Sequence, residues 1–551
     1  MTFKKNDILE VKIDDIGVNG EGIGKVDGYT LFVKDAIVAD VVRVKLTKVT
    51  KNYAYARLMD IIEASPLRTT PMCPVARACG GCQIQEMDYK AQLIFKREKV
   101  KNNIERIAGI KDFTIHNTLG MESPVHYRNK AQYPVGLDKE GNIVTGFYAG
   151  RTHSIIPCDD CIIGDEINGT ILAVIKEHMK KYAISPYNEE IGKGLVRHIL
   201  IRKGFKTSEI MVCIVVNGTK LPHSEELVTS LLEIEGMTSI SLNVNKAKTN
   251  VILGDKIIDL YGDGYITDYI GVVKFHISPL SFYQVNPVQT HVLYGKALEY
   301  AGLTGKETVW DLYCGVGTIS LFLAKLARKV YGVEIIPEAI EDARNNAKLN
   351  NIENAEFFVG KAEEVVPSYY NEQREKGNEA RADVIVVDPP RKGCDERLLA
   401  TMIKMQPKRI VYVSCDSATL ARDLKFLTEN GYEVKEVQPV DMFPHSVHVE
   451  TVILLSRKTP DAIIEIDLEM SELDLTRAES KATYKEIEEY VQNKYGLHVT
   501  NLYIAQVKRE FGIIERINYN VGDGKSRVPK VTPEKREAII DALKYFQMIE
   551  A

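Results

Sequence analysis

The chain has 551 residues with a formal net charge of −5, and 45% of its residues are hydrophobic. This length predicts several domains, and this composition excludes a disordered chain. No apolar run reaches the roughly 20 residues that cross a bilayer, and the first residues lack the pattern of a signal peptide. We therefore expect a cytoplasmic protein without membrane segments. The net charge neither predicts nor excludes a nucleic-acid partner, because a local basic face is enough for binding.

The amino-terminal segment, residues 1–62, has the pattern of a small β-barrel. Residues 8–13, 30–33 and 41–46 alternate apolar and polar side chains, as half-buried strands do. Glycines punctuate the turns between the first two of these runs. Several short strands within about sixty residues are typical of a small closed barrel.

Residues 63–275 carry mixed helical and strand patterns. Apolar residues recur at helical spacing over 88–109, and we expect this helix to pack on the domain that follows. Strand-like runs include 198–202 and 210–216, and one helix around 171–182 interrupts the strands. The region is therefore predicted to be a mixed α+β domain.

The cysteines of this region are grouped. The chain has nine cysteines, and an odd number argues against a disulfide framework. Cys73, Cys79 and Cys82 lie close together, which is typical of metal ligation, and a fourth ligand must come from elsewhere in the chain. Four thiolates suit zinc or a [4Fe–4S] cluster, although the gap between the first two cysteines is unusual for zinc ribbons. Unconnected buried thiols are the alternative.

From residue 276 to 457, strands and helices alternate. Buried strands are expected at 308–313, 329–334, 382–388 and 409–414, each followed by a helix. Such alternation predicts a parallel sheet with helices on both faces. Residues 371–381 have the composition of a polar insertion between elements.

The carboxyl-terminal residues have a different texture. Residues 458–482 are acidic and irregular, which predicts a linker, and residues 483–551 have the pattern of a helical tail. Thr483 and Glu486 form a capping box that opens a helix, and Gly496 ends it. Two further helices are expected in the tail. Their order resembles a helix-turn-helix only weakly, so a solvated helical cap is the favoured interpretation.

A glycine-rich turn follows the first strand of the alternating region. Gly315 and Gly317 let the backbone approach a ligand at the carboxyl edge of the sheet. The third glycine of the dinucleotide fingerprint is replaced by Ser320, so a ligand without a pyrophosphate fits better. Glu334 ends the next strand, where an acid pairs with ribose hydroxyls. These features favour S-adenosylmethionine over the alternative, a tight turn beside a solvated glutamate.

Three further strand ends carry reactive groups. Asp388 is followed by two prolines, which hold the chain rigid at the sheet edge. Cys415 lies between a strand and a helix, where a helix amino terminus is expected to lower the pKa of its thiol. Glu450 begins an apolar strand and is a candidate general base, although His445 and His448 lie nearby. The alternatives are a rigid loop, a core cysteine and a salt-bridged glutamate.

Together these segments resemble the RNA (uracil-5-)-methyltransferase family. The matching stretches are residues 281–286, 311–317, 388–393, 414–416 and 441–450. The amino-terminal barrel resembles the TRAM module, which binds RNA. The resemblance spans roughly residues 1–457 and implies a class I, Rossmann-like S-adenosylmethionine methyltransferase domain of α/β class over 276–457.

The resemblance implies roles for individual residues. Cys415 would attack C6 of uracil, and Glu450 would take the proton from C5. S-adenosylmethionine would contact Gln284, Tyr313, Glu334 and Asp388. Arg128 would help to hold RNA or the target base. A [4Fe–4S] cluster would be bound by Cys73, Cys79, Cys82 and Cys161, because residues 161–164 match the family segment better than the residues after Cys158.

The expected substrate is an RNA uridine, and 23S rRNA is the first expectation because members of this family that carry a cluster commonly act on it. Transfer RNA is the alternative target. A cytosine-C5 methyltransferase uses the same thiol addition, and an RNA-binding iron–sulfur protein without activity is the remaining alternative. We expect a monomer. The modified nucleotide is not identified by the sequence.

Overall fold

The computed structural model describes residues 3–150, 152–377, 382–458, 483–511, 531–546 and 548–549. The chain divides into two compact units, Met1–Thr459 and Pro460–Ala551, and each is described by itself. Of the expected linker, residues 459–482 lie outside the described residues. Within the described residues, no helix is long and apolar enough to cross a membrane.

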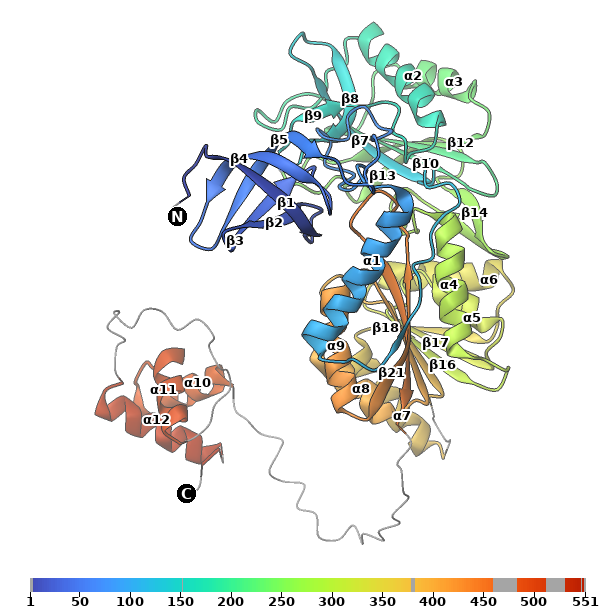
Figure 1. Ribbon diagram of the computed structural model, residues 1–551. Helices are drawn as coiled ribbons and strands as arrows, with labels where there is room; N and C mark the ends of the chain where they lie inside the picture. Colours follow the sequence, from blue (N-terminus) through green and yellow to red (C-terminus); the bar gives the residue numbers. More distant parts are fainter. Residues whose placement is uncertain are drawn as a thin grey trace. The chain divides into compact units, whose positions relative to one another are not determined.

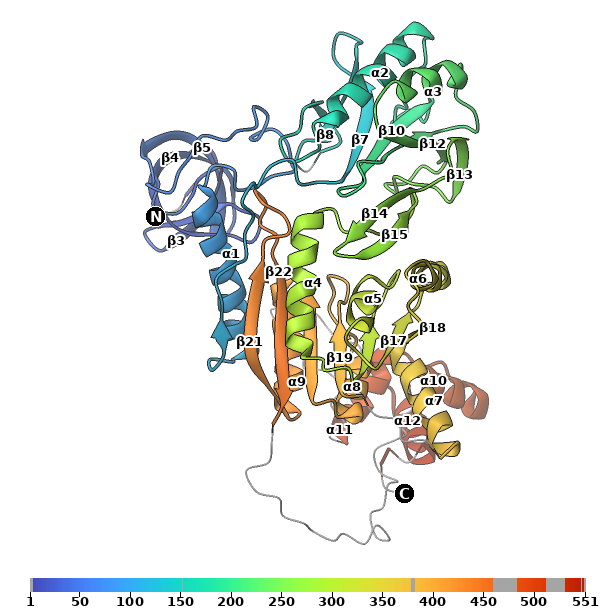
Figure 2. The ribbon, with the colours of Figure 1, turned by 90° about the vertical axis from the view of Figure 1, so that its right-hand side faces the viewer.

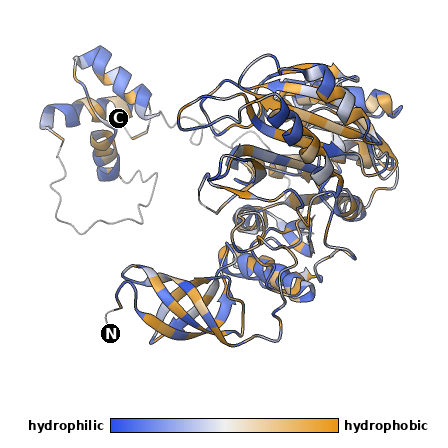
Figure 3. Cartoon of the chain, turned by 90° about the horizontal axis from the view of Figure 1, so that it is seen from above, coloured by the Kyte–Doolittle hydropathy of each residue, from blue (hydrophilic) through white to orange (hydrophobic). Residues whose placement is uncertain are grey.

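The first unit begins with the expected barrel. Its five strands close in the order β1-β2-β3-β5-β4 (Figure 1). They are β1 (Ile8–Ile16), β2 (Gly22–Val26), β3 (Tyr29–Lys34), β4 (Val41–Val49) and β5 (Tyr53–Glu63). Hydrophilic and hydrophobic residues alternate along these strands (Figure 3), and the hydrophobic ones fill the barrel. At Gly24 a Cβ atom would lie 2.3 Å from the Lys12 carbonyl oxygen, so only glycine lets β1 and β2 approach this closely.

A second sheet of seven strands follows, in the order β13-β12-β11-β10-β7-β8-β9. Its strands are β7 (Lys130–Leu137), β8 (Ile143–Tyr148), β9 (Ile155–Pro157), β10 (Val196–Lys203), β11 (Ile210–Val216), β12 (Met237–Val244) and β13 (Lys256–Tyr261). Helices α2 (Ile167–Lys181) and α3 (Ser224–Leu232) bury their apolar sides in one core with this sheet. The expectation of a single helix here is wrong: α3 is short, and only Leu227 and Leu231 among its residues are fully buried.

The third sheet has eight strands in the order β18-β17-β16-β19-β20-β22-β21-β6. They are β6 (Thr114–Ile115), β16 (Thr308–Leu312), β17 (Lys329–Glu334), β18 (Ala355–Val359), β19 (Val384–Val387), β20 (Arg409–Ser414), β21 (Tyr432–Val440) and β22 (Glu450–Arg457). Strands β16 to β20 pair in parallel, whereas β22 runs antiparallel to both β20 and β21. This doubly wound arrangement confirms the expected α/β class.

Helices cover both faces of this sheet (Figure 2). One face packs against α4 (Pro287–Ala301), α5 (Thr318–Ala324), α6 (Pro337–Leu349) and the hairpin of β14 (Ile266–Ile270) with β15 (Val273–Ile277). The other packs against α7 (Ala362–Glu375), α8 (Glu396–Met405), α9 (Ser417–Glu429) and the π-helix η1 (Ile104–Ala108). Residues 371–375 end α7, so the expected polar insertion is partly helical; the proline within α7, Pro367, obscured its pattern.

The helix predicted over residues 88–109 packs against the third sheet. Asp88 caps α1 (Tyr89–Asn103) by accepting from the Ala91 backbone N–H, and η1 continues it to Gly109. Val100 and Ile104 are fully buried in the same core as α9. Strand β6 then adds to the edge of the sheet beside β21.

The described residues of the second unit form three helices around a small core. They are α10 (Tyr484–Tyr495), α11 (Asn501–Glu510) and α12 (Pro533–Tyr545). The Thr483–Glu486 capping box is formed, and Gly496 ends α10 in the left-handed conformation. Ile487, Ile504 and Ile539 are fully buried between the helices.

Candidate functional site

Strand order determines where a ligand fits the third sheet. The chain passes from β16 to β17 and β18 on one side and returns to β19 and β20 on the other. Ligands of doubly wound folds bind at such a reversal, outside the carboxyl ends of the strands. A cavity of about 1470 Å³ lies there. Since single ligand sites usually measure about 300–1,000 Å³, this cavity has room for two ligands.

The cavity brings most of the predicted site residues together. Its lining includes Arg128, Gln284, Tyr313, Gly315, Glu334, Asp388, Cys415 and Glu450. Cys73, Cys79, Cys82 and Cys161 are not part of this lining, and of the predicted catalytic, cofactor and RNA residues only Gly317 is missing from it. Its φ is +81°, and a Cβ atom there would lie 3.1 Å from the Ala343 side chain, so this glycine lets the start of α5 pack on α6.

One end of the cavity is formed by the turn after β16. Tyr313 has a φ of +137°, a conformation that few residues other than glycine adopt, and strain of this kind gathers at functional sites. The Glu334 carboxylate accepts hydrogen bonds from the backbone N–H groups of Gly315 (3.3 Å), Ile335 (2.9 Å) and Ile336 (3.2 Å). These bonds hold an anionic group at the carboxyl end of β17.

Asp311 is a site residue that the sequence reasoning missed. It lies in β16, is fully buried and accepts a hydrogen bond from the Ser320 hydroxyl at 2.5 Å, while its Oδ1 has no partner among the described residues. Burial raises its pKa to about 7. Burial and the proximity of Asp311 also raise the pKa of Asp388 to about 7. An aspartate within an otherwise apolar strand was the available signal.

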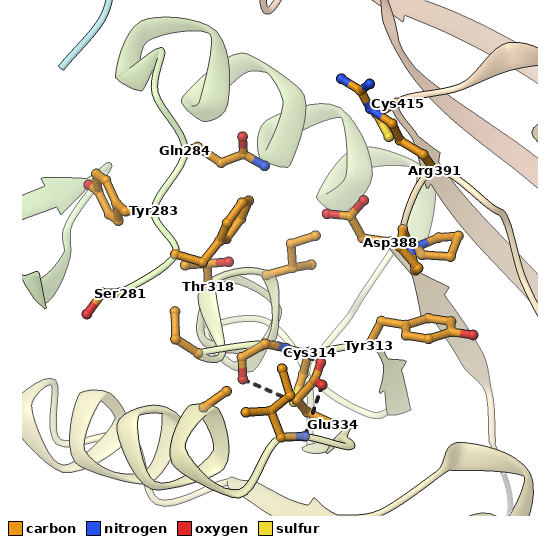
Figure 4. Close-up of a pocket in the computed structure, with 18 of the residues that line it drawn as sticks. Ser281, Tyr283, Gln284, Tyr313, Cys314, Thr318, Glu334, Asp388, Arg391 and Cys415 are labelled. Atoms are coloured by element: carbon orange, nitrogen blue, oxygen red, sulfur yellow. Dashed lines mark hydrogen bonds between the residues drawn. The ribbon is translucent and has the colours of Figure 1, made fainter. Parts of the chain in front are cut away.

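At the other end of the cavity, two strands place Cys415 and Glu450 opposite each other. Ser414 of β20 pairs with Thr451 of β22 in an antiparallel register. The next residue on each strand continues that register, so Cys415 and Glu450 are neighbours across the strands. Figure 4 shows Cys415, Arg391 and Asp388 gathered at the end of the cavity opposite Glu334.

The prediction of a lowered pKa for Cys415 is wrong. Burial and the carboxylates of Glu450 and Asp388 raise the pKa of the thiol to about 11, and Arg391 only partly offsets them. Burial and Asp388 likewise raise the pKa of Glu450 to about 8. In the resting protein at neutral pH both groups are therefore mainly protonated. The helix amino terminus was visible in the sequence, but the two carboxylates beside it were not.

Arg391 and His448 also line the cavity. Their effect on the charges in the site was not predicted from the sequence. The guanidinium of Arg391 is the positive charge facing Cys415 and Glu450. Burial and Arg391 lower the pKa of His448 to about 4, so this imidazole is neutral. His445 does not line the cavity: its Nδ1 lies 3.3 Å from the Gln92 amide nitrogen, on α1. Glu450 is thus the buried carboxylate placed next to the thiol.

Five thiols gather beside the cavity. Cys161 interacts electrostatically with Cys73, Cys79 and Cys82. These three cysteines precede it by about 80 residues, and the chain of the second sheet brings the two segments together. A hydrogen bond from the Cys158 thiol, with further bonds from the Ile163 and Gly164 backbone N–H groups, lowers the pKa of Cys161 to about 6. Within the described ranges, no group of three or more histidine, cysteine or acidic side chains has the geometry of a metal site.

The cysteine segment also contacts the loop that precedes Glu450. The backbone N–H groups of Gln83 and Ile84 donate to the His445 carbonyl at 3.0 and 3.1 Å. Gly80, Gly81 and Gln83 line the cavity. The segment that carries the thiols therefore contacts both the cavity and the loop that leads to Glu450.

The raised pKa of Glu450 predicts how stability depends on pH. A carboxyl whose pKa is raised by folding stabilises the native state below its unfolded pKa of about 4.5, and this contribution is lost as the pH rises through about 8. Glu450→Gln should therefore become more stable than the wild type by a few kcal/mol at pH 8.5, since one pKa unit corresponds to about 1.4 kcal/mol. Melting temperatures measured from pH 5 to 8.5 test this; a difference that does not grow with pH contradicts it.

Comparison with known proteins identifies the family. The tRNA (Uracil-5-)-methyltransferase family matches residues 258–458, and the TRAM domain matches residues 3–59. An uncharacterized RNA methyltransferase of Clostridium acetobutylicum is 54% identical over 457 residues, which cover 82% of this chain and 98% of that protein. An uncharacterized RNA methyltransferase of Bacillus cereus is 52% identical over 458 residues, which cover 82% of this chain and 97% of that protein.

A solved structure agrees with these matches. The tRNA (uracil-54, C5)-methyltransferase of Pyrococcus abyssi, in complex with S-adenosyl-L-homocysteine, is 28% identical with a TM-score of 0.65. The match covers 81% of this chain and all of that one. The barrel, the doubly wound sheet and the relatives agree: the chain is an S-adenosylmethionine-dependent enzyme that belongs to the RNA (uracil-5-)-methyltransferase family.

Proposed function

We propose that this protein methylates C5 of a uridine in RNA through a covalent bond between Cys415 and C6 of the base. The observation that carries the proposal is the pairing of a thiol and a buried carboxyl, Cys415 and Glu450, across β20 and β22. The two groups face a cavity whose far end holds the Glu334 carboxylate. A uracil and a methyl donor can therefore meet between them.

The chemistry requires both groups. C5 of uracil is too weak a nucleophile to take a methyl group directly. When the Cys415 sulfur bonds to C6, the C5=C6 electrons move toward O4, and C5 becomes enolate-like and nucleophilic. S-adenosylmethionine supplies the methyl group as an electrophile. C5 then carries both a methyl group and a proton; Glu450 removes that proton, the double bond re-forms, and the bond between sulfur and C6 breaks.

The electrostatics of the resting site constrain this sequence. Cys415 has to lose its proton before addition, and Glu450 has to be ionised before elimination. The raised pKa of Glu450 therefore predicts that turnover increases as the pH rises through about 8, and the raised pKa of Cys415 predicts a further increase toward about 11. Arg391 favours both ionised groups, and the neutral His448 adds no opposing charge.

We propose that Gln284, Tyr313, Gly315, Glu334 and Asp388 form the S-adenosylmethionine subsite, with Gly317 acting through the packing of α5. Glu334→Ala should weaken binding of S-adenosylmethionine by about 1.5–3 kcal/mol, as for a lost hydrogen bond to a charged group. RNA affinity should stay unchanged. Glu341→Ala, an exposed glutamate on α6 that does not line the cavity, is the matched control. Unchanged affinity of Glu334→Ala in calorimetry would remove Glu334 from the subsite.

We propose that Cys73, Cys79, Cys82 and Cys161 hold a [4Fe–4S] cluster, and the gathering of these thiols in one place is the reason for the proposal. Cluster ligands are thiolates that accept backbone N–H hydrogen bonds, and Cys161 has such donors in Ile163 and Gly164. The pKa of the Cys158 thiol is instead raised by its hydrogen bond to Cys161 and by burial, so this thiol keeps its proton. The cluster would fix the segment that borders the cavity, and the methyl transfer itself requires no electron from it.

Anaerobically purified protein should be brown and contain about four irons per chain. Cys161→Ser should lose the iron, whereas Cys158→Ser should keep it. Iron analysis with absorption spectroscopy measures both variants. Stoichiometric zinc without iron contradicts the cluster, and the reverse pattern of the two variants makes Cys158 the ligand.

We propose 23S rRNA as the RNA target. The proposal depends on the group of thiols, because members of the family that carry a cluster commonly act on this RNA. Transfer RNA is the second candidate, because the Pyrococcus abyssi enzyme acts on a tRNA uracil. Mapping of 5-methyluridine in both RNAs from a deletion strain distinguishes them. Loss of 5-methylcytidine instead would indicate a cytosine enzyme, and no loss of methyl groups would indicate an inactive binding protein.

A further inference from the structure

Two positive side chains of the second sheet lie directly opposite each other. The register of β7 and β10 pairs Lys130 with Arg202. Like charges opposite each other across strands destabilise a sheet. Arg128 precedes this pair on the chain and lines the cavity that contains Cys415. We call Arg128, Lys130 and Arg202 the basic triad.

Among the described residues, no carboxylate forms a salt bridge with the basic triad, and the acidic group that faces Arg128 is the Cys161 thiol. Arg202 is only 2% exposed, and the one side-chain hydrogen bond it makes to a described residue, 2.5 Å long, goes from Nη2 to the Ser281 carbonyl. Its Nε has no partner in the described part of the chain, and the same holds for Nε of Arg128. Lys130 is half-buried, and burial together with Arg202 and Arg128 lowers its pKa to about 8. The neighbouring residue Lys203 differs, because it pairs with Asp165 at 3.0 Å.

Holding such charges together destabilises the free protein. Burial removes them from water, and their mutual repulsion adds to that cost. An anion from outside would relieve both effects. The triad lies where such an anion would arrive with a substrate: Ser281, whose carbonyl holds Arg202, lines the cavity together with Arg128. The Arg128 guanidinium lies 5.9 Å from the ring of Phe443, another lining residue.

We propose that the basic triad is a subsite for a phosphodiester of the RNA backbone, next to the nucleotide whose base enters the cavity. Arg128 and Lys130 contact the phosphate, and the buried Arg202 adds positive potential from behind. The proposal rests on the proposed function only in taking RNA as the ligand. It explains why an unfavourable pair of cations is kept beside Arg128, which lines the cavity.

Lys130→Met tests the subsite. Binding of a single-stranded oligouridylate is measured by fluorescence anisotropy at several salt concentrations. The variant should bind roughly tenfold more weakly at low salt, and the slope of log K against log salt should fall by about 0.7, as for one lost phosphate contact on a single strand. Lys130→Arg should keep wild-type binding. Lys203→Met, whose charge is already paired, should keep the wild-type slope.

Two further measurements separate this role from a structural one. In the absence of RNA, Lys130→Met should melt at or above the wild-type temperature, because the repulsion is gone. A methylphosphonate oligouridylate, which lacks backbone charge, should bind the wild type and Lys130→Met equally. An unchanged salt slope, or equal weakening on both oligomers, overturns the proposal. A wild type that binds as predicted but forms no 5-methyluridine overturns the proposed function and leaves the phosphate subsite standing.

Discussion

Cys415→Ala should abolish methyl transfer, with a loss of at least about 10⁴-fold, because without the sulfur C5 of the uracil never becomes nucleophilic. The affinities for RNA and for S-adenosylmethionine should stay within about twofold, since the change removes one atom from the cavity wall. Transfer of a labelled methyl group measures the activity, and calorimetry measures binding.

Cys394→Ala is the matched control. Cys394 is buried beside Asp423, does not line the cavity, and burial raises its pKa to about 12. This variant should methylate RNA at the wild-type rate. Retained activity in Cys415→Ala would assign the nucleophile to another thiol, and Cys314, which also lines the cavity, would be the next candidate.

Glu450→Gln should fail at a later step than Cys415→Ala. Addition and methyl transfer do not need the carboxylate, but elimination does, so the variant should accumulate a methylated RNA joined covalently to the protein. Denaturing electrophoresis detects this complex, and the label of a radioactive methyl group should migrate with it. Turnover should fall by at least about 10²-fold, as for loss of a general base.

His448→Gln serves as the comparison for this assignment. His448 lines the same end of the cavity, but its lowered pKa makes it a weak base. The variant should turn over without accumulating the complex. Normal turnover of Glu450→Gln, or accumulation in His448→Gln instead, would transfer the role of base to the histidine.

The strand ends that hold the site follow from local patterns. The apolar runs before Gly315, Glu334 and Asp388 are short and buried, so their ends could be located without knowing which strands pair. The capping box at Thr483 is local in the same sense. These features depend on neighbours a few residues away.

Other features depend on contacts between distant segments, and the sequence did not reveal them. The raised pKa of Cys415 arises from Glu450, which β22 brings beside β20. The repulsion between Lys130 and Arg202 exists only because β7 pairs with β10 in one register. Helix α7 was hidden by Pro367, and α3 by its short apolar side. Pairing and burial, rather than composition, determine these properties.

The central claim, covalent addition of Cys415 to uracil C6, is tested most directly with RNA that contains 5-fluorouridine. Fluorine cannot leave C5 as a proton does, so elimination is blocked after methyl transfer. Incubation of the wild-type protein with this RNA and S-adenosylmethionine should give a complex that survives denaturing electrophoresis. Mass spectrometry of its peptides should find the methylated fluorouridine on Cys415, and Cys415→Ala should give none. An adduct on another cysteine, or one that still forms in Cys415→Ala, would contradict the account.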